Sequence, residues 1–301
     1  MNSISRLLIV AMGIASLGIS SAFADGCPNS AIAAARAQLK KAEDAEKAGK
    51  PKEAHAAARA VAWECLGNEA GKRREAIIKR SGRTLGEQEE KAGRLSEAFS
   101  WFENSGLPAD ADRVKLKQVK ARSDDIGTVS SAIGHFTSRK NDAQVKELRA
   151  LAAKNADQWL VTEDKLFATT TDSRDALSKT KDWLYYAGTG PKKAQERAER
   201  RGDALAAENG RRFLELAISY YSFANTPQKV KTVQDKARRL GESHARKGES
   251  EIAADYYKIA GLSAEAEKIH KQGEIRKQQA EQQRQNQFKK DQQSLEKELG
   301  L

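Results

Sequence analysis

Proline, aromatic residues and cysteine are all scarce in this sequence. Five prolines and 6% aromatic residues in 301 residues leave long helices uninterrupted and supply few large side chains for a wide core. Two cysteines exclude a disulfide-rich scaffold, and the lack of a C-x-x-C spacing argues against a redox pair. Beyond residue 24 no apolar run is long enough to cross a bilayer, so we expect no stable membrane insertion of the mature chain.

The sequence also lacks the motifs of common enzymes and metal sites. It has no G-x-S-x-G, no Walker-type loop and no H-E-x-x-H pattern. No histidine stands four residues from another; the histidines are His55, His135, His244 and His270. We therefore predict a non-enzymatic protein with no catalytic residue, cofactor or metal. An enzyme with a site between helices remains a weaker alternative.

The first 24 residues have the three parts of a secretory signal peptide. Arg6 gives a positive start, Leu7 to Leu17 forms a short apolar run, and Ala22-Phe23-Ala24 is a small-x-small cleavage site. We predict cleavage after Ala24 and a periplasmic or secreted protein. An uncleaved anchor and a lipid attached at Cys27 are the alternatives.

Cys27 and Cys65 are predicted to form a disulfide, because an exported chain with two cysteines meets an oxidising compartment. Ala31 to Ala48 is an unbroken helical run, and Gly49-Lys50-Pro51 ends it and starts another helix. This turn lies near the midpoint between the cysteines. An antiparallel hairpin would therefore bring them together, and a bridge closing such a loop stabilises by about 3–4 kcal/mol.

Strong helix formers dominate what is present, and charged residues make up 32% of the chain. The net charge of +11 favours acidic partners. Basic clusters occur at Lys72-Arg73-Arg74 together with Lys79-Arg80 and Arg83, and from Lys192 to Arg201. Solvated helix faces are the default interpretation of these clusters. An acidic envelope polymer or an acidic protein face is the alternative partner, and nucleic acid is not expected for an exported protein.

One segment of the sequence is repeated: Leu85 to Val114 returns as Leu240 to Ile269. Repetition at this length indicates stacked helical hairpins. The identical positions are Leu85/Leu240, Gly86/Gly241, Glu87/Glu242, Gly93/Gly248, Ala98/Ala253, Gly106/Gly261, Leu107/Leu262, Ala109/Ala264 and Ala111/Ala266.

The ordered set Leu-Gly, Gly, Ala, aromatic, Ala resembles the tetratricopeptide repeat. Small residues let two helices approach closely, and the aromatic fills the space between them. Glu89 and His244 depart from the family, which usually has an aromatic there, and the proline after the second helix is missing. The resemblance implies an all-α, tetratricopeptide-like solenoid that binds a partner rather than catalysing a reaction. The residues that carry it are Leu85-Gly86, Gly93, Ala98 and Phe102 in one copy, and Leu240-Gly241, Gly248, Ala253, Tyr257 and Ala260 in the other.

Weaker copies predict a helical-repeat domain over residues 25–270. Uneven spacing indicates unequal helices, with an insertion from Asn155 to Arg174. Residues 271–301 are rich in Gln, Lys and Glu, so we predict a polar C-terminal helix or a partly disordered tail, with a coiled-coil partner helix as the alternative. The second helix of each unit is predicted to end at Gly67, Gly106, Lys140, Gly188, Asn225 and Gly261.

Aromatic residues occur in adjacent pairs. Neighbours on a helix point about 100° apart, so one can fill the interior while the other faces the surface. One interpretation is that both members of each pair are packing residues. Alternatively, Trp101, Tyr220 and Tyr256 line a shared groove and stack on a peptide or sugar, which makes them the candidate partner-binding residues.

The expected function is therefore that of an exported scaffold, which binds a protein or peptide of the cell envelope through a helical-repeat groove. The alternative is a cell-envelope factor that binds glycan or peptidoglycan, or the helical arm of an envelope enzyme complex.

Overall fold

The structure, a computed structural model, describes residues 26–299. This range contains helices and no strand, which confirms the predicted all-α fold. The predicted signal peptide, residues 1–24, lies outside the described residues. None of the helices within the described range is long and apolar enough to cross a membrane. The chain divides into two compact units between Ser123 and Asp124.

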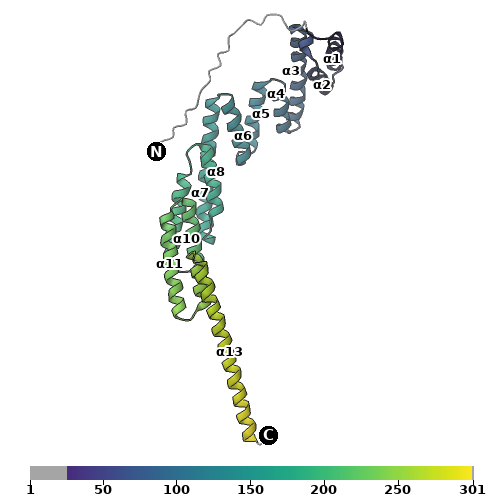
Figure 1. The fold of residues 1–301 in the computed structure, drawn as a ribbon. Helices are drawn as coiled ribbons and strands as arrows, with labels where there is room; N and C mark the ends of the chain where they lie inside the picture. Colours follow the sequence, from purple (N-terminus) through teal and green to yellow (C-terminus); the bar gives the residue numbers. More distant parts are fainter. Residues whose placement is uncertain (1–25, 300–301) are drawn as a thin grey trace, which may run out of the picture. The chain divides into compact units, whose positions relative to one another are not determined.

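The first unit consists of two packed hairpins and a further helix (Figure 1). Leu39, Ala54, Ala58 and Ile77 lie in its N-terminal core, with each side chain at most 4% exposed. Its elements are α1 (Asn29–Lys47), α2 (Pro51–Arg59), the short 3-10 helix η1 (Trp63–Cys65), α3 (Asn68–Lys91), α4 (Leu95–Asn104) and α5 (Pro108–Ala121).

The second unit continues the pattern with longer helices. The insertion expected between Asn155 and Arg174 lengthens α7 to 29 residues. Leu177, Leu214, Ala217 and Tyr220 lie at the centre of its core. Its elements are α6 (Ile126–Ser138), α7 (Asp142–Thr170), α8 (Arg174–Ala187), α9 (Lys192–Ala206), α10 (Arg211–Ala224), α11 (Pro227–Arg246), α12 (Ser250–Ile259) and α13 (Ser263–Leu299).

From α4 on, each turn that follows the second helix of a hairpin contains a residue with positive φ. In this left-handed conformation the backbone N–H groups that follow a helix donate hydrogen bonds to its last carbonyls. Leu107 N donates to Phe102 O at 2.9 Å, and Leu262 N donates to Tyr257 O at 2.8 Å. Five of the predicted hairpin ends are confirmed, with positive φ at Gly106 (66°), Lys140 (56°), Gly188 (76°), Asn225 (58°) and Gly261 (77°). The end predicted at Gly67 is wrong: α2 ends at Arg59, and Gly67, with φ 79° and ψ 177°, directly precedes α3.

Glycine permits close packing in the α3–α4 and α9–α10 hairpins. A Cβ placed on Gly86 of α3 would lie 2.6 Å from the ring of Phe102 on α4. The same addition on Gly202 of α9 would lie 2.6 Å from the ring of Tyr221 on α10. Any side chain at these glycines would push the aromatic ring out of its place between the helices.

Ion pairs join the first helices of successive hairpins. Glu46 of α1 binds Arg80 of α3 at 2.8 Å, and Asp203 of α9 binds Lys229 of α11 at 2.6 Å. Glu90 of α3 accepts hydrogen bonds from Arg113 and Lys117 of α5, which lower the pKa of that carboxyl to about 2. In each of these pairs the earlier helix supplies the acid and the later helix the base.

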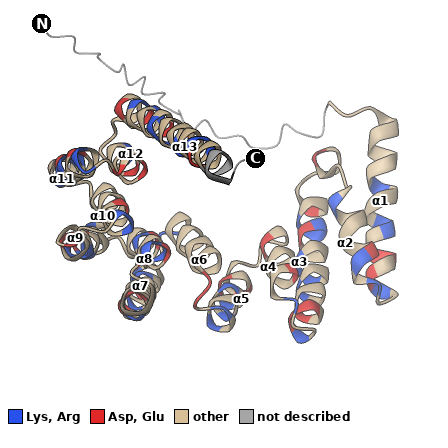
Figure 2. Cartoon of the chain, turned by 90° about the horizontal axis from the view of Figure 1, so that it is seen from below, with Lys and Arg blue, Asp and Glu red and all other residues tan. Residues whose placement is uncertain are grey.

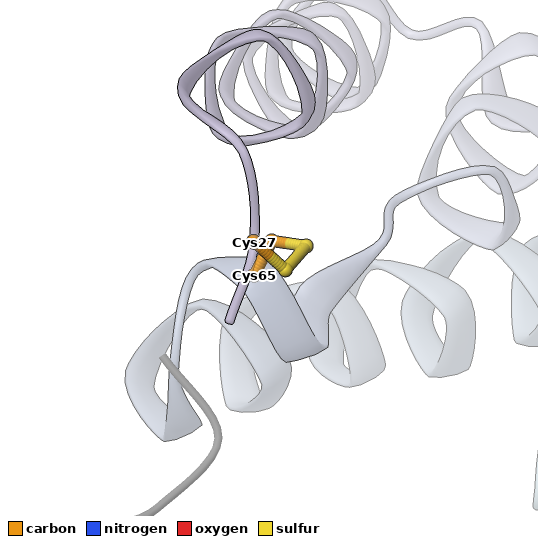
Figure 3. The surroundings of a disulfide bond; sticks show 2 residues. All are labelled: Cys27 and Cys65. Atoms are coloured by element: carbon orange, nitrogen blue, oxygen red, sulfur yellow. A yellow bond between two sulfur atoms is a disulfide. The ribbon is translucent and has the colours of Figure 1, made fainter. Parts of the chain in front are cut away.

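The two cysteines lie at disulfide distance, with their sulfurs 2.00 Å apart and their Cα atoms 5.6 Å apart (Figure 3). Cys27 precedes α1, and Cys65 lies in η1 after α2. The predicted hairpin geometry is thus correct, although the second cysteine lies in the link beyond α2. The bridge ties the start of the first hairpin to the segment that leads into α3.

The C-terminal helix α13 is 37 residues long. Its first turns pack on α12, where Ala266 is 2% exposed. From Glu274 to Ser294 every residue is exposed. The predicted boundary at residue 271 therefore falls inside one continuous helix. Of the two structures predicted for the tail, a polar helix or a partly disordered segment, the helix is the one present up to Leu299.

Candidate binding surface

Trp101 is half-buried on α4 of the first unit. Its ring meets the ring of His55 edge to face, with centroids 5.1 Å apart and planes at 89°. His55 Nε2 lies 3.2 Å from Ser105 Oγ, and the side chain of His55 is buried. Neighbouring Phe102 has no exposed surface. Trp101 thus covers a buried histidine and keeps some surface of its own.

Tyr220 of the second unit has no exposed surface. Its hydroxyl accepts a hydrogen bond from the backbone N–H of Ser173 at 2.7 Å and lies 2.9 Å from Ser173 Oγ. Its ring meets that of Phe167 edge to face. A buried ring offers no surface to a partner, so the structure corrects the groove hypothesis at Tyr220 and favours the packing alternative.

Tyr256 is also a packing residue, being 7% exposed. Its hydroxyl donates to Asn209 O at 2.8 Å, and its ring stacks on His244 with centroids 5.3 Å apart. Tyr257, expected inside, is half-buried. The roles predicted for these two tyrosines are therefore exchanged. Since Trp101 lies in the other unit, the three aromatics do not line a groove within one unit.

The basic cluster at the start of α3 is neutralised within the first unit. Its side chains bind acids or a carbonyl on the same helix or on neighbouring ones, so they join helices instead of forming a free patch. The contacts are Lys72–Glu69 at 2.8 Å, Arg73–Glu43 at 3.1 Å, Arg74 to Ala58 O at 3.0 Å, Lys79–Glu75 at 2.6 Å, Arg80–Glu46 at 2.8 Å and Arg83–Asp110 at 3.5 Å.

Arg201, the last residue of the basic run on α9, forms an ion pair with a buried acid. Glu163 of α7 has a fully buried side chain and receives two hydrogen bonds from Arg201, at 2.9 and 3.0 Å, and one from Ser173 Oγ at 2.6 Å. The Arg201 guanidinium also lies 4.2 Å from the centre of the Phe167 ring. These contacts occupy both carboxylate oxygens, so Glu163 connects helices rather than offering a free base. The sequence marks Arg201 only as part of a basic run and carries no signal of its pairing with Glu163.

A groove of about 680 Å³ lies between α1 and the start of α3, and we name it the α1–α3 groove. Apolar side chains line part of it, including half-buried Ile32 and Leu66. Arg36, Lys40 and Lys47 project at its edges and have no ion pair within the described range. The remaining lining residues are Leu39, Glu43, Asp44, Cys65, Glu69, Ala70 and Arg73.

This arrangement can accommodate a ligand. The groove has a volume within the range of ligand pockets. Among the described residues, its three unpaired bases outnumber its one unpaired acid, Asp44, so the groove attracts negative charge, and its apolar lining can bury a side chain. Between residues 26 and 299, no group of three His, Cys, Asp or Glu side chains is placed to hold a metal ion.

Comparison with known proteins adds no relative: no family model matches the chain, and neither does any curated protein. The helical-repeat assignment therefore depends on the packed hairpins, the recurring left-handed turns and the internal sequence repeat.

Proposed function

We propose that the protein is a non-enzymatic, tetratricopeptide-like scaffold that binds a protein or peptide segment in the α1–α3 groove. The observation that carries this proposal is the combination of the half-buried apolar side chains of Ile32 and Leu66 with the unpaired bases Arg36, Lys40 and Lys47. An acidic segment with one or two apolar side chains complements that surface in both charge and polarity.

The disulfide supports a preformed site. Cys65 lines one end of the α1–α3 groove and is joined to Cys27 just before α1. The bridge therefore limits the motion of α1 relative to the start of α3. A groove held in place before binding loses less conformational entropy when the partner arrives.

An extracytoplasmic location fits the same cysteine pair. Disulfides persist in oxidising compartments and are rare in the cytosol. The signal-like pattern of residues 1–24 agrees with export. The proposed partner is accordingly a protein or peptide of the cell envelope.

Affinity capture from envelope extract, followed by mass spectrometry, identifies the partner, and titration calorimetry then measures its binding to three variants. Arg36→Glu and Lys40→Glu each reverse a charge at the groove, and we expect each to weaken binding by about tenfold. Lys52→Glu reverses an equally exposed charge on α2, outside the groove, and should bind as the wild type does. Equal affinity of all three variants for the partner would rule out the groove as the site.

A glycan or peptidoglycan ligand is the second candidate function, supported by one exposed aromatic. Tyr185 at the end of α8 is 73% exposed, and its ring lies 5.2 Å from that of Tyr186. Exposed aromatic rings stack well on sugars. Sedimentation with purified peptidoglycan tests this candidate: Tyr185→Ala should lower the bound fraction, and a wild-type protein that stays in the supernatant would eliminate it.

A further inference from the structure

The exposed part of α13, residues 274–294, is a long helical segment that buries none of its side chains in the described structure. Isolated helices are marginally stable in water, because most helical stability in proteins comes from packing. Figure 2 shows acidic and basic residues interspersed along the ribbon of α13. The order of these charges indicates what packs there.

Five exposed residues form one stripe along this helix: Glu274, Lys277, Glu281, Arg284 and Phe288. Their spacing of three and four residues places them on one helix face. We name them the α13 stripe. Phe288 is 65% exposed, which is unusual for a phenylalanine.

The stripe borders an open pocket of about 680 Å³, where α13 leaves the start of α12. The four charged residues of the stripe line it, together with Ile252, His270 and Gly273. Lys277 binds Glu251 of α12 at 2.5 Å. Glu281 and Arg284 form no ion pair within the described part of the chain.

Read from its two ends, the charged part of the α13 stripe carries opposite charges at corresponding positions. Glu274 and Arg284 are equally far from Gln279 in opposite directions and carry opposite charges, and so do Lys277 and Glu281. An antiparallel second copy would therefore place each acid opposite a base. A parallel copy in register would place like charges together, which destabilises a helix pair.

We propose that a second copy of this chain docks antiparallel along the α13 stripe, so that the protein forms a weak dimer through its C-terminal helices. Glu274 pairs with Arg284 of the second copy, and Lys277 pairs with Glu281 of the second copy. The same register places Phe288 opposite His270, which lines the pocket beside Ile252 and Gly273. This interface is separate from the α1–α3 groove and does not depend on the proposed function.

A charge exchange tests the pairing in the full mature chain by sedimentation equilibrium. Lys277→Glu places two acids opposite each other twice per dimer, as Glu281→Lys does with two bases, so each should raise the dimer Kd by about tenfold. The double variant Lys277→Glu/Glu281→Lys restores opposite charges and should dimerise as the wild type does. Lys290→Glu, an equal change of charge outside the stripe, serves as the control.

Spin labels test the direction of the pair. The described range has no free cysteine, so a single introduced cysteine carries the label. Gln279→Cys lies at the centre of the proposed overlap and should give a short distance between copies. Gln293→Cys should give a distance of about 40 Å, because each helix rises 1.5 Å per residue away from the centre.

Three results would overturn the proposal: a monomer at all concentrations, a dimer whose Kd ignores the charge exchange, or short distances at both labels. The last would show parallel helices. A wild-type monomer that binds a different protein through α13 would assign the stripe to that protein instead of a second copy.

Discussion

Arg201 on α9 makes two hydrogen bonds to Glu163 on α7, at 2.9 and 3.0 Å, and the side chain of Glu163 is fully buried. Ser173 adds a third donor at 2.6 Å, and its amide and hydroxyl also hold the hydroxyl of Tyr220. The network thus joins α7, the start of α8, α9 and α10. A buried ion pair of this kind stabilises little by itself, but losing one partner leaves an uncompensated charge in the core.

Arg201→Ala should therefore destabilise the second unit strongly. Glu163 would remain buried with the Ser173 hydroxyl as its donor and with Arg197 Nη1 3.6 Å away as its remaining base. That longer contact compensates the charge only in part, so the free energy of unfolding should fall by about 3 kcal/mol. Arg200→Ala, on the same helix but exposed and without an ion pair in the described range, should change it by less than about 0.5 kcal/mol. Urea unfolding measures the free energy of unfolding of both variants. If both lose the same amount, the contact between Arg201 and Glu163 does not stabilise the unit.

Lys140 has a left-handed backbone, with φ of 56°, at a position where other hairpins carry glycine. For a residue with a Cβ, this conformation costs about 1 kcal/mol or more in free energy. Lys140→Gly should therefore raise the free energy of unfolding by about 0.5–1 kcal/mol. Gly188→Ala makes the opposite change at the end of α8 and should lower it by a similar amount. Thermal unfolding checks both signs, and a destabilised Lys140→Gly protein would contradict the argument.

His55 should make the first unit sensitive to acid. Burial lowers the pKa of His55 below its usual value, and nearby Arg59 lowers it further. The unfolded chain binds a proton at this residue near pH 6.5, whereas the folded protein resists it. The contribution of neutral His55 to stability is thus present above about pH 6.5 and declines as the pH falls towards the pKa of the folded state.

Urea unfolding at about pH 7.5 and about pH 5.5 measures this effect. The free energy of unfolding should fall more between these two pH values for the wild type than for His55→Gln, which keeps a polar group beside Ser105. His135, His244 and His270 are present in both proteins, so their contributions cancel in the comparison. Equal pH dependence of the two proteins would show that His55 is not the group responsible.

The hairpin ends from Gly106 on were predictable from the sequence because they depend on local chemistry: a left-handed residue favours glycine or asparagine, and the hairpin length recurs. The inner member of an aromatic pair was not predictable at α12. A rotation of about 100° exchanges Tyr256 and Tyr257, and the contacts that decide it, with Asn209 and His244, come from other helices. The pairing of Glu163 with Arg201 likewise depends on how α7 meets α9.

The burial of Tyr256 reverses an expectation about the two tyrosines. Tyr256→Ala removes a buried ring, its hydrogen bond to Asn209 O and its stacking on His244, so it should destabilise by about 3–5 kcal/mol. Tyr257→Ala, at a half-buried position, should cost less. On α4 the order is the other way round: Phe102→Ala should cost more than Trp101→Ala, since Phe102 is fully buried. Denaturant unfolding of the four variants would contradict this if Tyr257→Ala were the more damaging of its pair.

Shortening α13 separates its packed start from its exposed arm. A chain ending at Gly273 loses a segment that is exposed from Glu274 to Ser294, so little apolar surface leaves the core. Its melting temperature should stay within about 3 °C of the full mature chain, which corresponds to roughly 1 kcal/mol in a unit of this size. A chain ending at Gly261 also loses Ala266 and the cover that α13 gives to α12, and should melt at least about 5 °C lower. Calorimetry below the dimer concentration range compares the folds without the contribution of association. If the chain ending at Gly273 melts as early as the chain ending at Gly261, the exposed arm stabilises the fold within a single copy, and its exposure then needs another explanation.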